Sequence, residues 1–374
     1  MTGPVVLAAG GTGGHLFPAQ ALAAELVRRM IPVALLTDRR AAGYDTRFPG
    51  VDVHVVPSGT PAARGVMAKV RAGLDIALGV VAALRLLRRI RPSVVVGFGG
   101  YPSLPTMVAA QRLGLPTLIH EQNAVLGRVN RLVAGHAAAI AASILPLQSV
   151  RAADEPKVVL TGNPVRDEVR AVHGVPYSAP DTSGEIRLLV LGGSQGATVL
   201  SDVVPAALAS LPDALRPRLR VVQQCRPEDL IRVRAAYDAA NINADLASFI
   251  ADVPTHLANC HLAITRAGAS TVAELTVAGR PSILVPYLHA MDDHQTANAR
   301  ALQAGGATLV MPQREFTSVT LRDALQALLL DGNRLTTMAG AAHRLGRPDA
   351  AAALAVLVAG HGRNGGKATM ARAA

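Results

Sequence analysis

The sequence predicts an α/β fold made of two similarly built halves, each a parallel sheet covered by helices. Short aliphatic runs alternate with helical patterns along almost all of the 374 residues, which is the rhythm of βαβ units. An apolar strand that leads into a Gly-Gly-hydroxyl-x-Gly turn occurs twice, at residues 5–14 (VVLAAGGTGG) and 188–197 (LLVLGGSQGA). Because 374 residues exceed one core of ordinary size, we expect one domain for each series.

The two series are separated by a stretch rich in Pro, Gly and Ser at residues 174–185. In the first series we expect strands in PVVLAA (4–9), VALLT (33–37), VDVHVV (51–56), SVVVGF (93–98), TLIH (117–120), AAAIAAS (137–143) and KVVLTG (157–162), and helices at 16–29, 66–90, 103–113 and 125–133. In the second series we expect strands in IRLLVLGG (186–193), LRVVQQC (219–225), DLASFI (245–250), HLAIT (261–265), PSILVP (281–286) and ATLVM (307–311).

The domain junction is expected near Asn163 and Pro164. This gives an N-terminal domain of residues 1–163 and a C-terminal domain of residues 164–346. A last helix at 347–360 follows the second series, and its apolar pattern fits packing on either half. Residues 361–374 are basic and rich in Gly, and we predict a disordered tail there.

The composition favours some partners over others. The formal charge is +11 and the pI is about 10.7, which favours anionic partners such as phosphates, nucleotides or an acidic lipid surface. Only 3% of the residues are aromatic and there is no Trp, so nucleic-acid binding through base stacking is disfavoured. Cys225 and Cys260 lack metal or disulfide spacing, so we expect buried thiols in a reducing cytosol. Residues 4–9 read as a strand without a basic leader before them, so no secretory signal is expected.

In the first glycine turn, Gly10–Gly14, every residue except Thr12 is a glycine and lacks a Cβ atom. Its backbone N–H groups are expected to approach an anion or a sugar hydroxyl, with the positive end of the next helix behind them. The dinucleotide pattern GxGxxG fails at Leu16, but Asp38 ends the second strand as a ribose ligand would, which keeps a nicotinamide enzyme as an alternative. His15 is either a general base or a histidine that only caps the helix or bonds a backbone group.

The second glycine turn offers Ser194 and the backbone of Gly193–Ala197 as phosphate donors. The absence of a Lys after the glycines excludes a P-loop, and an ordinary tight turn is the alternative. In RAGASTVAE (266–274), Thr271 and Glu274 have the spacing of a capping box. A Glu274 carboxylate in the first turn of a helix would equally suit the two hydroxyls of a ribose.

Three polar residues, Asp292, Asp293 and His294, gather at the entrance of a later helix. They fit either metal ligands or N-capping groups. No Asp-x-Asp triplet occurs in the chain, so the usual carboxylate clamp for a metal-bound nucleotide sugar is missing.

Two further stretches, GFGGYPSLP (97–105) and HEQNAVLGRVNRL (120–132), follow strands of the first series. Binding loops of parallel sheets lie at such positions. Glu121, Gln122 and Asn123 therefore either read sugar hydroxyls or cap the helix that follows.

The most apolar long stretch, residues 66–91, is interrupted by Lys69, Arg71 and Asp75, so no transmembrane helix is predicted. Seven Lys or Arg residues lie within 64–91. A helix that lies on an anionic membrane and a core-facing helix with a solvated basic edge both fit this pattern. The apolar residues at helical spacing are Val66, Val70, Leu74, Ala77 and Val81.

Seven motifs follow one another across residues 10–298: GGTGGH, GFGGYPS, HEQN, TGNPVR, GGSQGA, RAGASTVAE and DDHQTANA. In this order they resemble the MurG family of bacterial peptidoglycan glycosyltransferases, in glycosyltransferase family 28. The resemblance implies a GT-B fold, with two Rossmann-like parallel-sheet domains that face each other across a cleft. It also implies that the C-terminal domain holds most of the nucleotide sugar and that the last helix packs back on the N-terminal domain.

The reaction implied by the resemblance is an inverting transfer of N-acetylglucosamine from UDP-GlcNAc to the 4-hydroxyl of the N-acetylmuramoyl unit of lipid I, which gives lipid II. No metal or other cofactor is implied. The implied location is the cytoplasmic face of the bacterial cell membrane, as a peripheral protein of peptidoglycan synthesis, cell-wall biogenesis and cell division, alongside other cell-wall synthesis proteins. Another UDP-sugar GT-B enzyme (a glycolipid synthase or a UDP-GlcNAc epimerase) and a non-catalytic nucleotide-sugar sensor remain alternatives.

The resemblance also assigns roles to single positions, with His15 as the candidate base. Donor binding is implied for Thr12, Gly13 and Gly14 (sugar and phosphates), Asn123 (sugar), Arg166 (nucleotide), Ser194 (diphosphate), Ile250 (uracil, through its backbone), Ala269, Ser270, Thr271 and Glu274 (ribose and phosphates, with Glu274 on the diol) and Gln295 (GlcNAc hydroxyls). Two features depart from the family. His294 stands before Gln295 where some relatives have a second glutamine, and the membrane-facing patch lacks aromatic anchors.

Overall fold

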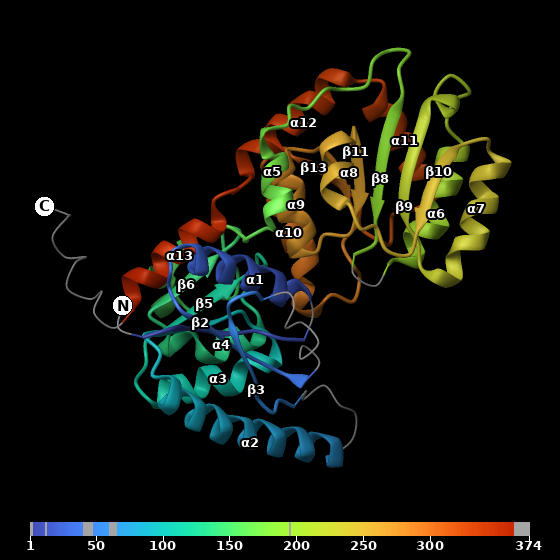
Figure 1. Ribbon diagram of the computed structural model, residues 1–374. Coiled ribbons are helices and arrows are strands. Elements are labelled where there is room, and N and C mark those ends of the chain that lie inside the picture. The colour runs from blue at the N-terminus through green and yellow to red at the C-terminus, as the bar shows by residue number, and fades with distance from the viewer. Residues whose placement is uncertain (1–2, 12, 40–47, 60–65, 194–195, 363–374) are drawn as a thin grey trace, which may run out of the picture. The chain divides into compact units, whose positions relative to one another are not determined.

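The computed structural model describes residues 3–11, 13–39, 48–59, 66–193 and 196–362. The chain divides into two compact units, which are described separately below. The first unit is Met1–Arg166 together with Asp349–Ala374, and the second unit is Asp167–Pro348. Each unit contains a parallel sheet with helices around it, which confirms the predicted fold class (Figure 1).

The first unit is built on a sheet whose neighbouring strands are all parallel. Its strands are β1 (Val5–Ala8), β2 (Val33–Thr37), β3 (Asp52–Val55), β4 (Val94–Gly97), β5 (Thr117–Glu121), β6 (Ala139–Ala142) and β7 (Val158–Leu160). They lie in the order β3-β2-β1-β4-β5-β6-β7. The helices of this unit are α1 (Gly13–Arg28), α2 (Val66–Ile90), α3 (Gly100–Arg112), α4 (Arg128–Val133) and α13 (Ala350–His361).

The sequence of β1 explains why this sheet is covered on both faces. Val5 and Leu7 pack with α1 and α13 on one face, whereas Val6 and Ala8 pack with α2 and α3 on the other. Since both sides of the strand are buried, β1 is apolar throughout and shows no alternation with polar residues.

Helices α1 and α3 both begin earlier than the sequence pattern predicts. The structure places their first residues at Gly13 and Gly100, rather than at residues 16 and 103. Glycine and proline have low helix propensity, so the first turns of these helices carry no helical signature in the sequence. As a consequence, His15 is the third residue of α1 and lies at its N-terminal end.

The second unit repeats this architecture. Its strands are β8 (Ile186–Leu191), β9 (Leu219–Gln224), β10 (Asn243–Ala247), β11 (Leu262–Thr265), β12 (Ser282–Leu284) and β13 (Thr308–Val310), in the order β10-β9-β8-β11-β12-β13. All neighbouring strands are parallel. Its helices are α5 (Asp167–Ala171), α6 (Thr198–Ala209), α7 (Leu230–Ala239), α8 (Val253–Asn259), α9 (Ala269–Ala278), α10 (His294–Ala304), α11 (Ser318–Leu329) and α12 (Gly332–Leu345).

The core of the second unit lies between its sheet and α6, α7, α11 and α12. A buried arginine, Arg280, stabilises the end of α8. Its guanidinium donates hydrogen bonds to the carbonyl oxygens of Leu257 and Ala258 at 2.9 and 2.6 Å. The two cysteines of the chain are free and buried, as expected from their spacing.

Helix α13 belongs to the core of the first unit, although it follows the second unit in the sequence. Leu354, Ala355 and Val358 are buried in the same cluster as the apolar residues of α1 and β1. The predicted tail lies almost wholly outside the described residues, which end at residue 362.

We expect the substitution Leu354→Ala to destabilise the first unit by about 2–5 kcal/mol, because this fully buried side chain would leave a cavity between α13 and α1. Val356 on the same helix is 61% exposed, so Val356→Ala should change the free energy of unfolding by less than about 0.5 kcal/mol. Urea denaturation of both variants measures the difference. Equal stability of the two variants would contradict the packing of α13 on this core.

Candidate active site

Each sheet reverses its strand order once, and the reversals give the positions of the candidate sites. In the first unit the reversal lies between β1 and β4, and in the second unit it lies between β8 and β11. The helices on the two sides of such a reversal leave toward opposite faces, so a crevice opens at the carboxyl ends of the two strands. Both glycine turns and the GFGGYPS and RAGAST segments follow these four strands directly.

The glycine turn of the first unit is fixed by Asp38. Gly11 has a φ of +83°, and its backbone N–H donates to Asp38 Oδ1 at 3.3 Å. A Cβ at Gly10 would lie 2.7 Å from Cβ of Pro102. This close packing explains the need for glycine. It also gives the buried Asp38 carboxylate a role within the loop, so Asp38 supplies no support for the nicotinamide alternative.

His15 is anchored by the side chain of Gln122. Its Nδ1 lies 3.2 Å from Gln122 Oε1, across 107 positions of sequence. The other side of the ring faces Gly100, where a Cβ would lie 3.2 Å from Nε2. The imidazole is half-buried. Because its Nδ1 bonds a side chain of the HEQN segment, the alternative of a histidine that bonds a backbone group is wrong for this nitrogen.

The carboxylate of Glu121 organises the loop after β5. Its Oε1 accepts hydrogen bonds from the backbone and the side-chain nitrogens of Asn123 at 3.1 and 3.2 Å. Its Oε2 accepts from the backbone nitrogen of Gly127 and from Nδ2 of Asn130, both at 2.8 Å. Glu121 thus stabilises the conformation of the loop and orients Asn123. The family resemblance implies that Asn123 contacts the sugar.

Arg166 ends the first unit and lies above an aromatic ring. Its guanidinium carbon is 5.6 Å from the centroid of Phe17, a cation–π geometry. A Cβ at Gly13 would lie 2.9 Å from the same ring. Phe17 therefore connects the start of α1 with Arg166. Gly14 is exposed at the start of α1, and Thr12 lies outside the described residues.

In the second unit, α9 begins with an open N-terminus. Its N-cap is Gly268, which has no side chain to occupy the end of the helix. Among the described residues, the buried hydroxyl of Ser270 finds no hydrogen-bond partner. Unpaired N–H groups, the helix dipole and an unused hydroxyl together form an anion-binding arrangement. Ala269, Ser270 and Thr271 make up this first turn.

The position of α9 also corrects the sequence interpretation of Thr271 and Glu274. Because the helix starts at Ala269, Thr271 cannot be its N-cap, and the predicted capping box is wrong. Glu274 lies one turn further along the helix than expected.

The second glycine turn, which follows β8, has left-handed backbone at Gly193 and Gly196, with φ of +84° and +70°. Ser194 of this turn lies outside the described residues.

Two further predicted residues of the second unit are Gln295, in the first turn of α10, and Ile250, in the loop between β10 and α8. Gln295 Oε1 accepts a hydrogen bond from the backbone nitrogen of Tyr287 at 2.9 Å, so this side chain holds the loop before α10.

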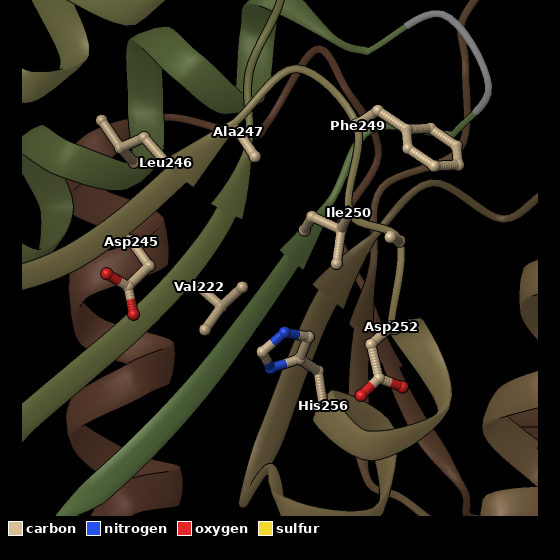
Figure 2. A pocket seen from close by; sticks show the side chains of 9 residues that line it. Val222, Asp245, Leu246, Ala247, Phe249, Ile250, Asp252 and His256 are labelled. Carbon is tan, nitrogen blue, oxygen red and sulfur yellow. The ribbon is translucent and has the colours of Figure 1, made fainter.

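Ile250 is buried beside a pocket of about 280 Å³ (Figure 2). Figure 2 shows its side chain pointing toward His256, whereas the ring of Phe249 turns away. The pocket is lined by Val222, Asp245, Leu246, Ala247, Phe249, Ile250, Ala251, Asp252 and His256.

The acidic cluster before α10 makes local contacts. Asp293 Oδ1 accepts from Thr296 Oγ1 at 2.7 Å, and His294 Nδ1 lies 2.7 Å from the carbonyl oxygen of Met291. Across the part of the chain that the structure describes, no group of three or more His, Cys, Asp or Glu side chains is arranged to hold a metal ion.

Sequence reasoning missed several residues of the first crevice. Gly100, Asn130 and the specific contact of Gln122 became visible only in the fold, because each pairs with a residue far away in the sequence. The GFGG and HEQN patterns pointed to the loops after β4 and β5, but they carried no signal for which residue contacts which.

Comparisons with known proteins identify the family. The model of the glycosyltransferase family 28 N-terminal domain matches residues 5–142, and that of the family 28 C-terminal domain matches residues 187–354. A protein of Paramagnetospirillum magneticum named UDP-N-acetylglucosamine–N-acetylmuramyl-(pentapeptide) pyrophosphoryl-undecaprenol N-acetylglucosamine transferase is 53% identical, over 95% of this chain and 96% of the relative. A protein of Rhodospirillum centenum with the same name is also 53% identical, over 96% and 94%.

A solved structure agrees with these relatives. The crystal structure of Acinetobacter baumannii MurG superposes with a TM-score of 0.78 at 29% identity, and the match covers 95% of this chain and 99% of that one.

We expect Glu121→Gln to lower the stability of the first unit by about 1–3 kcal/mol, because an amide NH2 would then face N–H donors at one of the two oxygen positions. Thermal unfolding measures the loss, and the exposed Glu155 of the same unit provides the control Glu155→Gln. If both variants melt with the wild type, the carboxylate of Glu121 does not organise this loop.

Proposed function

The chain belongs to glycosyltransferase family 28, and we propose that it transfers N-acetylglucosamine from UDP-GlcNAc to the 4-hydroxyl of the N-acetylmuramoyl unit of lipid I, which gives lipid II. The observation that carries the proposal is the match over nearly the whole chain to relatives named for this transfer. The geometry of the two crevices supplies the groups that such a reaction needs.

The reaction is a direct displacement with inversion. The acceptor oxygen attacks the anomeric carbon, the bond from that carbon to the diphosphate breaks, and UDP leaves. The hydroxyl loses its proton as the new bond forms, and His15 accepts it. An imidazole suits this step because its unprotonated nitrogen carries a lone pair that can accept the proton.

The departing diphosphate needs positive potential. The open N-terminus of α9 supplies backbone N–H groups and a helix dipole, and the Ser270 hydroxyl adds a further donor. The other donor contacts that we propose are those of Thr12, Gly13, Gly14, Asn123, Arg166, Ser194, Ile250, Ala269, Thr271, Glu274 and Gln295. The loop of Ile250 beside the pocket in Figure 2 is our candidate for the uracil site.

The test is an assay with radiolabelled UDP-GlcNAc and a lipid I analogue. We expect label in a lipid-linked disaccharide. Formation of UDP-ManNAc would instead indicate an epimerase, and label in another glycolipid would indicate a different transferase. Binding of UDP-GlcNAc without turnover on any acceptor would indicate a sensor.

In the same assay, His15→Ala should lower kcat by about 10²–10⁴-fold, because the transition state loses its proton acceptor. The affinity for UDP-GlcNAc should stay close to that of the wild type. His136→Ala is the matched control, since His136 is exposed in the same unit. A His15→Ala enzyme with unchanged kcat would eliminate this residue as the base.

We propose that α2 docks the protein on the cytoplasmic face of the cell membrane. Helix α2 packs against α3 (Figure 1). Apolar side chains on the side of α2 away from this contact are exposed to solvent. Exposed basic residues accompany them, at Arg71, Arg85, Arg88 and Arg89. None of the helices in the described ranges is long and apolar enough to cross a bilayer. The exposed apolar residues are Met67, Val70, Leu74, Leu78 and Val81.

This arrangement combines the two sequence interpretations of the segment. Ala72, Val80, Ala83 and Leu87 face the core, while the exposed apolar side chains form a separate stripe. Apolar burial in the headgroup region and attraction between arginines and anionic lipids would then act together.

We expect the double substitution Leu74→Asp and Leu78→Asp to weaken sedimentation with phosphatidylglycerol vesicles by at least about 10-fold, because two exposed leucines would no longer enter the bilayer. Val356→Asp is the control, since Val356 is exposed on α13, which packs on the opposite face of the sheet. Vesicle binding that is insensitive to the α2 change would place the membrane contact elsewhere.

A further inference from the structure

Gln122 lies at the centre of a chain of hydrogen bonds between two histidines. Its Oε1 is 3.2 Å from His15 Nδ1, and its Nε2 is 3.2 Å from His120 Nδ1. The Nε2 atom also donates to the carbonyl oxygen of Phe98 at 2.9 Å. At the far end, His120 Nε2 is 3.2 Å from the carbonyl oxygen of Gly162.

The two carbonyl oxygens fix the direction of every bond in this chain. A carbonyl oxygen only accepts, so the group of Gln122 that faces Phe98 must be its NH2. The oxygen of the amide then faces His15, and since an amide oxygen also only accepts, His15 must carry a proton on Nδ1. In the same way, the bond to Gly162 requires the proton of His120 on Nε2, which leaves its Nδ1 to accept from Gln122.

The second histidine, His120, is the fixed end of this chain of hydrogen bonds. His120 is fully buried, and burial lowers its pKa to about 4, so its ring stays neutral at physiological pH. Gln122 itself is 2% exposed. A flipped amide would place the Gln122 oxygen against the carbonyl oxygen of Phe98, so the hydrogen bonds themselves hold the amide in this orientation.

We propose that Gln122 is a positioning residue that holds neutral His15 in the Nδ1–H tautomer and so makes Nε2 the atom that accepts the proton of the acceptor hydroxyl. This inference rests on the proposed function of His15 as the base. In the described part of the chain only Nδ1 of His15 is hydrogen-bonded, and glycine at position 100 keeps the space beside Nε2 clear. The tautomer of an imidazole is set by the bond that its other nitrogen makes.

The direct test is NMR of the protein labelled with ¹⁵N-histidine, with His15 assigned from the spectrum of His15→Ala. With the His15 ring neutral, the ring nitrogens of the wild type should report a proton on Nδ1. In Gln122→Met, which has a similar volume and no acceptor, the proton should move wholly or partly to Nε2. In Gln122→Glu, a protonated carboxyl can donate its O–H to the carbonyl oxygen of Phe98 and keep its other oxygen toward His15, so the Nδ1–H form should be kept.

Kinetics provide the second readout. Gln122→Met should lower kcat by about 10- to 100-fold, with little change in KM for UDP-GlcNAc. Losses of this size are typical when the hydrogen-bond partner that orients a metal-binding histidine is removed. Gln122→Glu should restore part of kcat. Gln111→Met is the matched control, because Gln111 also donates to a backbone carbonyl of this unit, that of Val133, at 2.8 Å. It should change neither the His15 tautomer nor kcat.

The outcomes separate this inference from the proposed function. A wild-type spectrum with the His15 proton on Nε2, or a Gln122→Met spectrum identical to the wild type, would overturn the role of Gln122 whatever the enzyme transfers. Absence of a lipid-linked disaccharide with the Nδ1–H tautomer present would instead overturn the proposed reaction and leave the hydrogen-bond assignment standing.

Discussion

The reversal of strand order at the centre of each sheet is the constraint on which the rest of the site depends. The helices that follow β1 and β4, and those that follow β8 and β11, leave toward opposite faces, and parallel sheets bind their ligands at the carboxyl ends of such strands. The chain places glycine turns and helix N-termini in both crevices. Backbone N–H groups can then approach a ligand that a Cβ atom would keep away.

The first crevice has a polar floor, which is costly to bury. His120, Glu121 and Gln122 follow one another at the end of a central strand and are at most 2% exposed. Such groups are tolerated only when their hydrogen bonds are satisfied, because an unpaired polar atom in the interior loses its hydration without compensation. Glu121 accepts bonds from the loop that follows it, and the other two side chains bond each other and backbone carbonyls. The result is a rigid support below His15.

The strands could be predicted well from the sequence because a strand buried on both faces is a short, wholly apolar run, as β1 and β4 are. Helix starts were predicted less well. Gly13 and Gly100 begin helices only because the fold turns the chain there. The low helix propensity of glycine predicts no helix start at either position. The capping-box interpretation of Thr271 failed for a related reason: the spacing was right, but the helix had already begun at Ala269. Motifs indicated the loops of the candidate site, while the pairing of His15 with Gln122 depends on sheet order and is invisible in any local pattern.

The two crevices differ in a way that follows from the chemistry proposed for them. Proton transfer needs one atom with a defined lone pair, and a directional chain of buried hydrogen bonds can select a single nitrogen of one imidazole. A leaving diphosphate spreads its charge over several oxygens, so it is served better by the diffuse potential of a helix end and by several weak donors such as those at Ser270. A buried network of side chains in the first unit and an open helix N-terminus in the second are therefore different solutions to different demands, built on the same sheet topology.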